Sequence, residues 1–192
     1  MLKLALLHNK PEIFHTIQGE GKNLGKPSVF IRLSLCNLYC IWCDTDYTWN
    51  WQGTPFPHNN DQLKNYRKFN KKDYIVRLSD DEIIAQILPY NCRNIVITGG
   101  EPLIQQTNLT AYVNTCKTTD ARYPIEFETN GTIIPNRELD QLTDQYNVSI
   151  KLSNSKVEYA DRIVPDAIAF FANSDKANFK FVVDQPADLE EI

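Results

Sequence analysis

Long apolar runs and strong net charge are both missing from this chain of 192 residues. No stretch approaches the roughly 18–20 uninterrupted apolar residues that span a bilayer, and the first residues, MLKLALLHNKPEIF, contain no small-residue cleavage site. A membrane anchor and a signal peptide are therefore not expected. The net charge of −4 disfavours general nucleic-acid binding. With 42% hydrophobic and 23% charged residues, we expect a cytoplasmic protein that folds as one domain over residues 1–192.

Glycine is also scarce, and its placement is informative. Most of the seven glycines lie in three short strings, QGEG (18–21), TGGEP (98–102) and ETNGT (128–132). Glycine permits tight turns and a close approach of the backbone to a ligand. The three strings are therefore candidates for functional loops.

Cysteine is present in an odd number, five, which does not form a disulfide framework in a chain of this length. Cys36, Cys40 and Cys43 fall within eight residues, and this clustering indicates a chemical role. The isolated cysteines are interpreted as small buried hydrophobic side chains and the histidines as structural or surface residues: Cys92, Cys116, His8, His15 and His58.

Short β-branched runs alternate with amphipathic segments, which predicts an α/β fold with a mostly parallel sheet. Strands are expected at 28–35, 94–98, 124–128, 148–152 and 178–183. Helices are expected after the capping box at 79–82, through 109–116 and around 138–146. Ligands of such sheets bind beyond the carboxyl ends of the strands. Cys36, Gly99, Glu128 and Lys151 lie at or just past such ends.

Two segments depart from this alternation. Residues 51–77 are polar and rich in Asn and Lys, and they are interpreted as a solvated loop or hairpin that leaves the sheet. The string YRKFNKKDY within them also mixes basic and aromatic residues in a way that suits nucleic acid. Residues 186–192, PADLEEI, resemble the first turn of a helix.

The cysteine loop itself restricts the choice of metal. A structural zinc site takes four ligands, commonly as two separated pairs. Three cysteines instead suit a four-iron cluster, in which one iron keeps an open position for a substrate or cofactor. An iron–sulfur cluster is therefore favoured over zinc and over reduced thiols without metal.

The string CNLYCIWC (36–43) resembles the Cx3CxΦC signature of the radical S-adenosylmethionine (SAM) superfamily, with Trp42 as the aromatic Φ. TIQGEG, CDT, TGGEP, ETNGT and SIK together resemble the 7-carboxy-7-deazaguanine synthase family, over a span from Glu12 to Asp188. The resemblance implies a partial (β/α) barrel. It also implies a carbon–nitrogen lyase that converts 6-carboxy-5,6,7,8-tetrahydropterin into 7-carboxy-7-deazaguanine and ammonia, for 7-deazapurines such as queuosine.

The same resemblance implies the cofactors, the course of the reaction and the partners. A [4Fe–4S] cluster and SAM would generate an adenosyl radical that removes hydrogen from C6 of the pterin, and SAM would be regenerated afterwards. Mg²⁺ would organise the substrate carboxylate. The implied partners are the pterin, an electron donor such as flavodoxin or ferredoxin, and a second copy in a homodimer, with no membrane or nucleic acid.

Roles carried over from the family fall on three groups of residues, and none of them is a catalytic acid or base. Cys36, Cys40 and Cys43 would ligate the cluster, and Thr45 would ligate Mg²⁺. The residues assigned to SAM are Trp42, Asp44, Gly99, Gly100, Glu101, Glu128, Ser149 and Lys151. The residues assigned to the pterin are Ile17, Gln18, Gly19, Glu20, Arg32 and Thr98. Ile150 stands where the family usually has proline.

Plain structural alternatives remain open for several of these residues. Trp42 could be a core aromatic, Thr45 a cap or turn residue, and Lys151 a solvated strand-end lysine. Arg32 interrupts an apolar strand, which favours a buried partner, but it could also lie on the solvent face.

Two other functions also remain open. One is a glycyl-radical-enzyme activase, a radical SAM protein against which the QGEG and CDT strings argue. The other is a non-enzymatic zinc module that binds RNA through residues 51–77. Family members usually continue well beyond the NFKFVV string at 178–183, so we expect a C-terminal tail to be missing from this chain.

Overall fold

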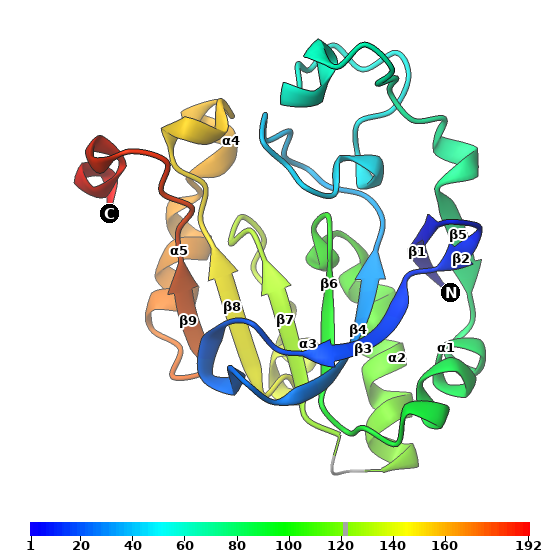
Figure 1. Cartoon of the computed structure of the whole chain (residues 1–192). Helices are drawn as coiled ribbons and strands as arrows, with labels where there is room; N and C mark the ends of the chain where they lie inside the picture. The colour runs from blue at the N-terminus through cyan, green and yellow to red at the C-terminus, as the bar shows by residue number, and fades with distance from the viewer. Residues whose placement is uncertain (121–122) are drawn as a thin grey trace.

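A computed structural model describes residues 1–120 and 123–192 of the chain. In this part of the chain, nine strands form one sheet in the order β2-β1-β4-β6-β7-β8-β9, with β3 paired to β4 and β5 paired to β1 (Figure 1). The strands are β1 (Leu2–Leu7), β2 (Lys10–Pro11), β3 (Ile13–Ile17), β4 (Pro27–Leu33), β5 (Ile75–Leu78), β6 (Ile95–Gly99), β7 (Ile125–Thr129), β8 (Gln145–Ser149) and β9 (Ala177–Lys180).

Strands β4, β6, β7, β8 and β9 all run parallel, with β9 at the edge of the sheet. Their carboxyl ends therefore meet along one edge of the sheet, at the top of Figure 1. The register places Arg32 of β4 beside Thr98 of β6, and Glu128 of β7 beside Asn147 of β8. The prediction of an α/β fold with a mostly parallel sheet is confirmed.

The antiparallel strands were not anticipated from the sequence. β1, β2, β3 and β5 add antiparallel pairings at the β4 side of the sheet. All five residues of β3 pair with β4, from Ile13 opposite Ile31 to Ile17 opposite Pro27. This pairing places the end of β3 beside the amino end of β4, and the QGEG string that follows reaches β7, where Gln18 Nε2 donates to Glu126 and Glu128.

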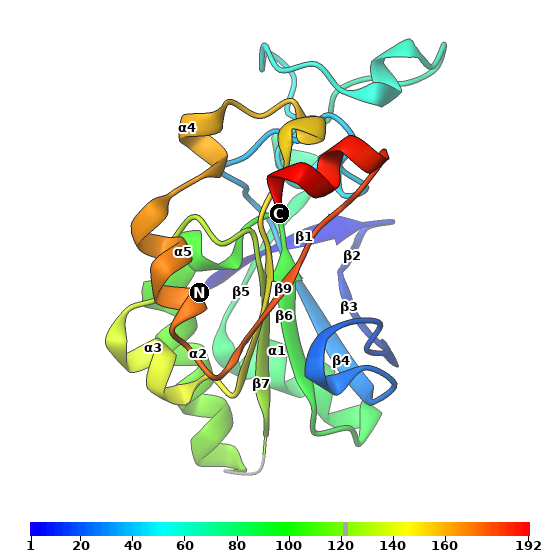
Figure 2. The same ribbon diagram turned by 90° about the vertical axis from the view of Figure 1, so that its left-hand side faces the viewer.

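The helices are α1 (Asp80–Ile87), α2 (Gln106–Thr119), α3 (Arg137–Leu142), α4 (Tyr159–Arg162) and α5 (Pro165–Ala172). Figure 2 shows α2, α3 and α5 together on one face of the sheet. The predicted capping box is present, because Ser79 Oγ accepts from the Glu82 N–H while the Glu82 carboxylate accepts from the Ser79 N–H. Across the described ranges, we find no helix with the length and apolar character needed to cross a membrane.

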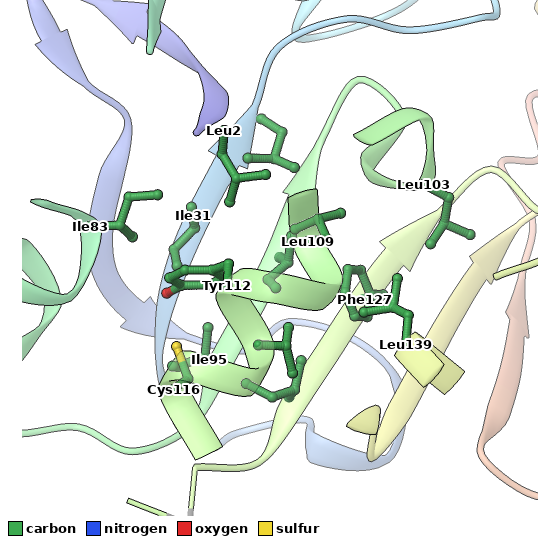
Figure 3. Packing of buried hydrophobic residues seen from close by; sticks show 14 of the residues in the cluster. Leu2, Ile31, Ile83, Ile95, Leu103, Leu109, Tyr112, Cys116, Phe127 and Leu139 are labelled. Atoms are coloured by element: carbon green, nitrogen blue, oxygen red, sulfur yellow. The ribbon is translucent and has the colours of Figure 1, made fainter. Parts of the chain in front are cut away.

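The core lies between the parallel strands and these helices. Ile31, Ile95 and Phe127 project from the strands and pack with Leu109 and Tyr112 of α2, and all five are fully buried (Figure 3). Burial of one such side chain contributes about 1.5–3 kcal/mol. Alternate residues of the same strands, such as Arg32 and Thr98, face away from this core, and they supply the site.

Several predicted boundaries are wrong because pairing between strands overrides the local pattern, and the strands predicted at 28–35 and 148–152 end at Leu33 and Ser149. The helix expected to reach residue 146 ends at Leu142, and the next strand begins at Gln145 instead of 148. Thr143 Oγ1 donates to the Leu139 carbonyl at the helix end, and Gln145 pairs with Glu126. The strand predicted at 178–183 likewise ends at 180.

Residues 51–74 leave the sheet and return to it at β5. They form short 3₁₀ turns at Asn59–Gln62 and Lys71–Asp73, and Trp51 bridges to Phe69. At the other end of the chain, Pro186–Glu191 form a 3₁₀ helix. Both segments lie at the same end of the sheet as the carboxyl ends of the parallel strands (Figure 1).

Candidate functional site

A cavity of about 260 Å³ opens at the carboxyl ends of the parallel strands. Each of β4, β6, β7, β8 and β9 contributes at least one residue from its end or from the loop that follows. The lining residues are Glu20, Arg32, Cys36, Leu38, Cys40, Trp42, Cys43, Asp44, Thr45, Trp49, Thr98, Gly99, Gly100, Glu128, Thr129, Asn130, Asn147, Ser149, Lys151 and Lys180.

The cysteine loop starts immediately after β4. Leu35, the residue before Cys36, has φ = 84°, a left-handed conformation that turns the chain out of the sheet. The Leu35 N–H donates to the Thr48 carbonyl and the Cys43 N–H to the Cys40 carbonyl, so the loop is internally held. All three clustered thiols are free and face the cavity.

The environment of these thiols bears on what they bind. Burial raises the pKa of the Cys36 thiol well above its ordinary range and that of Cys40 to about 11. Both therefore stay protonated at neutral pH until a metal displaces the proton. Within residues 1–120 and 123–192, no group of three or more His, Cys, Asp or Glu side chains is arranged to hold a single metal ion. In a four-iron cluster each thiolate binds a different iron, and three thiols spread around a cavity fit that group.

The glycine pair of TGGEP is required by the end of β4. Gly99 has φ = 134°, and a Cβ there would lie 2.0 Å from the Leu33 carbonyl oxygen. A Cβ on Gly100 would lie 2.2 Å from the Leu35 carbonyl oxygen. Main chain fills both positions, so any larger side chain would push β6 away from the strand that carries the cysteine loop.

Glu128 sits at the centre of a cluster of polar groups. Its carboxylate accepts from Thr98 Oγ1 at 2.6 Å and from Gln18 Nε2 at 3.4 Å. Burial, with a further contribution from Glu20, raises the pKa of Glu128 to about 7. Glu20 in turn pairs with Lys180 of β9 at 2.6 Å. The cluster thus offers both donors and acceptors, and near neutral pH Glu128 can act as either.

Arg32 is not on a solvent face. Its side chain is 19% exposed and lines the cavity, with Nε 2.7 Å from Glu12 Oε1. Desolvation lowers the pKa of Arg32, but the adjacent Glu12 carboxylate outweighs this and raises it overall. The Tyr47 hydroxyl also donates to Glu12, at 2.7 Å. The guanidinium is therefore fixed in place with its charge already balanced.

Trp42 and Lys151 line the same cavity. The Lys151 ammonium lies 5.6 Å from the centroid of the Trp42 ring, within cation–π range, and donates to Ser149 Oγ at 2.8 Å. Trp42 Nε1 donates to Asn154 Oδ1 at 3.2 Å. These contacts bring together three residues that the resemblance assigned to one cofactor, from segments more than 100 positions apart.

All the site residues expected from the sequence line this cavity except Ile17, Gln18, Gly19 and Glu101. Gln18 and Gly19 line an adjoining hollow, which shares Glu20, Glu128 and Lys180 with the cavity. Ile17 is 62% exposed and lines neither space.

Glu101 does not face the cavity, and this differs from its assignment to the SAM amino group. Its carboxylate is fully buried and accepts from the Leu103 N–H, the Asn130 N–H and the Thr129 hydroxyl. Burial raises the pKa of Glu101, and these hydrogen bonds oppose the rise. The carboxylate therefore holds the ETNGT loop against the TGGEP loop.

Sequence reasoning missed several lining residues: Leu38, Trp49, Thr129, Asn130, Asn147 and Lys180. Thr129 and Asn130 belong to the ETNGT string, which could have identified them as candidate site residues. Asn147 and Lys180 lie in strands that alternate polar and apolar residues, a pattern too common to single them out. Only the parallel register reveals that both reach the same cavity.

A family model described as "Radical SAM superfamily" matches residues 31–170. This span begins within β4 and includes the cysteine loop and the parallel strands through β8. Together with the three thiols at the cavity, the match makes this a radical SAM protein. The open-iron cluster and SAM are the cofactors that membership of the superfamily implies.

More specific relatives narrow this assignment. The chain is 39% identical over 183 residues to a 7-carboxy-7-deazaguanine synthase of Pyrobaculum aerophilum, covering 94% of this chain and 69% of the relative. It is 37% identical to the synthase of Neisseria meningitidis serogroup B, with 86% and 68% covered. The crystal structure of QueE from Escherichia coli matches with a TM-score of 0.63 and 27% identity, covering 98% of this chain and 75% of that one. The chain belongs to the 7-carboxy-7-deazaguanine synthase family, and it spans about two thirds of the length of these curated relatives.

Proposed function

We propose that the protein converts 6-carboxy-5,6,7,8-tetrahydropterin into 7-carboxy-7-deazaguanine and ammonia, within the synthesis of 7-deazapurines such as queuosine. One observation carries this proposal. Three thiols, a glycine pair and a cluster of carboxylate, guanidinium and ammonium groups surround a single cavity at the strand ends. The name of the family supplies the product, and the polar cluster fits the chemistry of a pterin carboxylate.

Cys36, Cys40 and Cys43 would hold the [4Fe–4S] cluster. When bound, the cluster and SAM supply an adenosyl radical, which is the difficult chemistry of the reaction. The protein's task is then to hold the three thiols in place, exclude water and orient the two ligands. Burial of Cys40, which is 6% exposed, serves the second of these requirements.

The SAM side of the cavity would be formed by Trp42, Asp44, the Gly99–Gly100 backbone, Ser149 and Lys151. The indole offers a flat apolar face of the kind on which a nucleobase stacks. Lys151 donates a hydrogen bond to Ser149 and makes a cation–π contact with Trp42. These contacts restrict the Lys151 and Trp42 side chains before SAM binds.

The substrate side would be formed by Glu20, Thr98 and Arg32, with Gln18 and Gly19 at the adjoining hollow. Glu128, which the resemblance assigns to SAM, contacts Thr98 and Gln18 and would lie between the two ligands. Carboxylate and amide oxygens accept from the N–H groups of an amino-pyrimidinone edge. Arg32 would bind the substrate carboxylate, because a guanidinium matches the geometry of that group. The structure adds Lys180, whose ammonium reaches Glu20 from β9 and places a second cation beside the hollow.

Mg²⁺ would bind at Thr45. The Thr45 hydroxyl faces the cavity 3.6 Å from Cys43 Sγ, and it makes no side-chain cap to the 3₁₀ turn that follows. A single hydroxyl is a weak ligand for this cation, so waters and substrate oxygens would complete its shell. In this proposal Mg²⁺ affinity depends on the pterin carboxylate.

The wider setting of this activity is also proposed. Five free cysteines suit a reducing cytoplasm. Cluster chemistry needs an electron donor such as flavodoxin or ferredoxin. A homodimer of single-domain chains is the assembly that the family resemblance implies.

The test is an anaerobic assay of protein reconstituted with iron and sulfide. Wild-type protein should be brown, and with SAM, reductant, pterin and Mg²⁺ it should form 7-carboxy-7-deazaguanine. Cys36→Ala should abolish both colour and product, whereas Cys92→Ala, which changes a cysteine outside the cavity, should keep both. SAM cleavage without product would reject the pterin substrate, and a colourless zinc-loaded protein would reject the cluster.

A further inference from the structure

The side-chain amide of Asn154 joins Trp42 to the C-terminal 3₁₀ helix. Asn154 Nδ2 donates to Asp188 Oδ2 and to the Val182 carbonyl, both at 2.8 Å. Its Oδ1 accepts from Trp42 Nε1 at 3.2 Å. Because both amide hydrogens are directed at acceptors, the amide has one orientation, and its oxygen must face the indole.

Asp188 enforces this orientation. It is 2% exposed, and the same Oδ2 accepts from the backbone N–H groups of Asp184 at 2.8 Å and Gln185 at 3.2 Å. These contacts, with the Asp184 hydrogen bond the largest, lower the pKa of Asp188, so it is ionised at neutral pH. An ionised carboxylate has no hydrogen to donate, and it therefore accepts only the NH₂ side of the Asn154 amide.

A second contact holds the same loop to the same 3₁₀ helix. Glu191 accepts from the Ser153 N–H at 3.0 Å and pairs with Arg162 at 3.2 Å. Arg162 Nη1 also donates to the Lys151 carbonyl at 2.9 Å. Figure 2 shows this C-terminal segment, in red, beside the segment that follows β8. The acidic residues Asp188 and Glu191 of this segment thus contact Asn154 and Ser153, which lie three and two positions after the cavity residue Lys151.

We propose that Asn154 and Asp188 are positioning residues that fix the plane of the Trp42 indole for SAM. This proposal rests on the proposed function, in which Trp42 lines the SAM side of the cavity. Lys151 restrains the ring from its face and Asn154 from its edge, and neither contact requires the ligand. A ring held in this way loses little freedom when the ligand binds, which strengthens binding.

The first test uses the cluster-free protein and the ¹⁵N–¹H indole signals of its three tryptophans. Trp42→Phe identifies the Trp42 signal by its loss. Asn154→Ala and Asp188→Asn should both shift that signal and speed its exchange with deuterium. Glu190→Gln, which removes a charge from an exposed neighbour, should leave it unchanged. A Trp42 signal that stays in place in both variants would overturn the proposal.

The second test measures SAM dissociation constants of the reconstituted protein in a double-mutant cycle. Asn154→Ala should weaken SAM binding about fivefold, the effect of one typical hydrogen bond. The same change in a Trp42→Phe background should cost almost nothing more, since the indole N–H is already gone. Equal losses in both backgrounds would overturn the proposal. Should Asn154→Ala fail to fold, Asp188→Asn takes its place in the cycle.

These tests separate the proposal from the proposed function. Wild-type protein that binds SAM but makes no carboxydeazaguanine would reject the pterin reaction and leave the positioning role supported by the cycle. Wild-type protein that binds no SAM would reject both. An indole signal that responds only to Asn154→Ala would reject the part assigned to Asp188.

Discussion

Replacing the ionisable carboxyl of Glu128 should change how the stability of the protein depends on pH. The pKa of this buried carboxyl is raised from 4.5 to about 7, so the folded chain keeps a proton there that the unfolded chain has lost. The folded state binds more protons between these two values, and stability therefore falls as pH rises through this window. Each pKa unit corresponds to about 1.4 kcal/mol, so the fall attributable to Glu128 over the whole window is at most about 3.5 kcal/mol.

Glu128→Gln keeps the shape of the side chain and cannot ionise. Urea unfolding of the cluster-free protein at about pH 5 and about pH 8 should show the variant losing less stability than wild type, by up to about 3 kcal/mol. Glu190→Gln removes an exposed carboxylate and should follow wild type. The same loss in wild type and Glu128→Gln would refute the assignment of the raised pKa to burial beside Glu20.

Three further outcomes are expected. Gly99→Ala should destabilise the fold by more than about 2 kcal/mol in urea unfolding, because the added Cβ meets the β4 backbone. Gly25→Ala is the control: Gly25 also has a positive φ but has open space around it, so the loss of stability should be smaller. Equal losses would show that φ alone matters. Arg32→Ala should raise the KM for the pterin at least tenfold while SAM cleavage is partly retained, and an unchanged KM would remove Arg32 from the site. Glu101→Leu should lower stability by about 3 kcal/mol or more, since buried donors lose their acceptor; a stability within about 0.5 kcal/mol of wild type would contradict that role.

Much of the fold was predictable because the relevant signals are local and strong. The runs at 94–98 and 124–128 are short, apolar and bounded by turn residues, and each became a central parallel strand within one residue of the expected limits. The capping box at Ser79 fixed the start of α1. The cysteine loop was predictable because three thiols at such spacing have few structural explanations.

The remaining features depend on distant parts of the chain. Gln145 and Tyr146 continue a helical pattern, yet pairing with β7 draws them into β8. Glu101 follows a glycine pair and so looked exposed to a ligand, but the Thr129 hydroxyl and the Asn130 N–H from another loop occupy its carboxylate. Lys180 gave no local signal, and its place beside the cavity follows from the pairing of β9 with β8 and from the ion pair with Glu20.

Gly99 and Gly100 fit so closely against the chain at and after the end of β4 that they are needed whatever the cavity binds. Positions 99 and 100 must lack side chains because of main-chain oxygens of their own protein, at a place where the cavity also happens to open. A descendant that lost its cysteines would no longer bind a cluster, but it would still need both glycines for β6 to pair with β4. The cysteines would vary freely in such a lineage while the glycines persisted. The glycine pair would thus persist as a record of sheet geometry, and without the thiols it would not by itself indicate the chemistry.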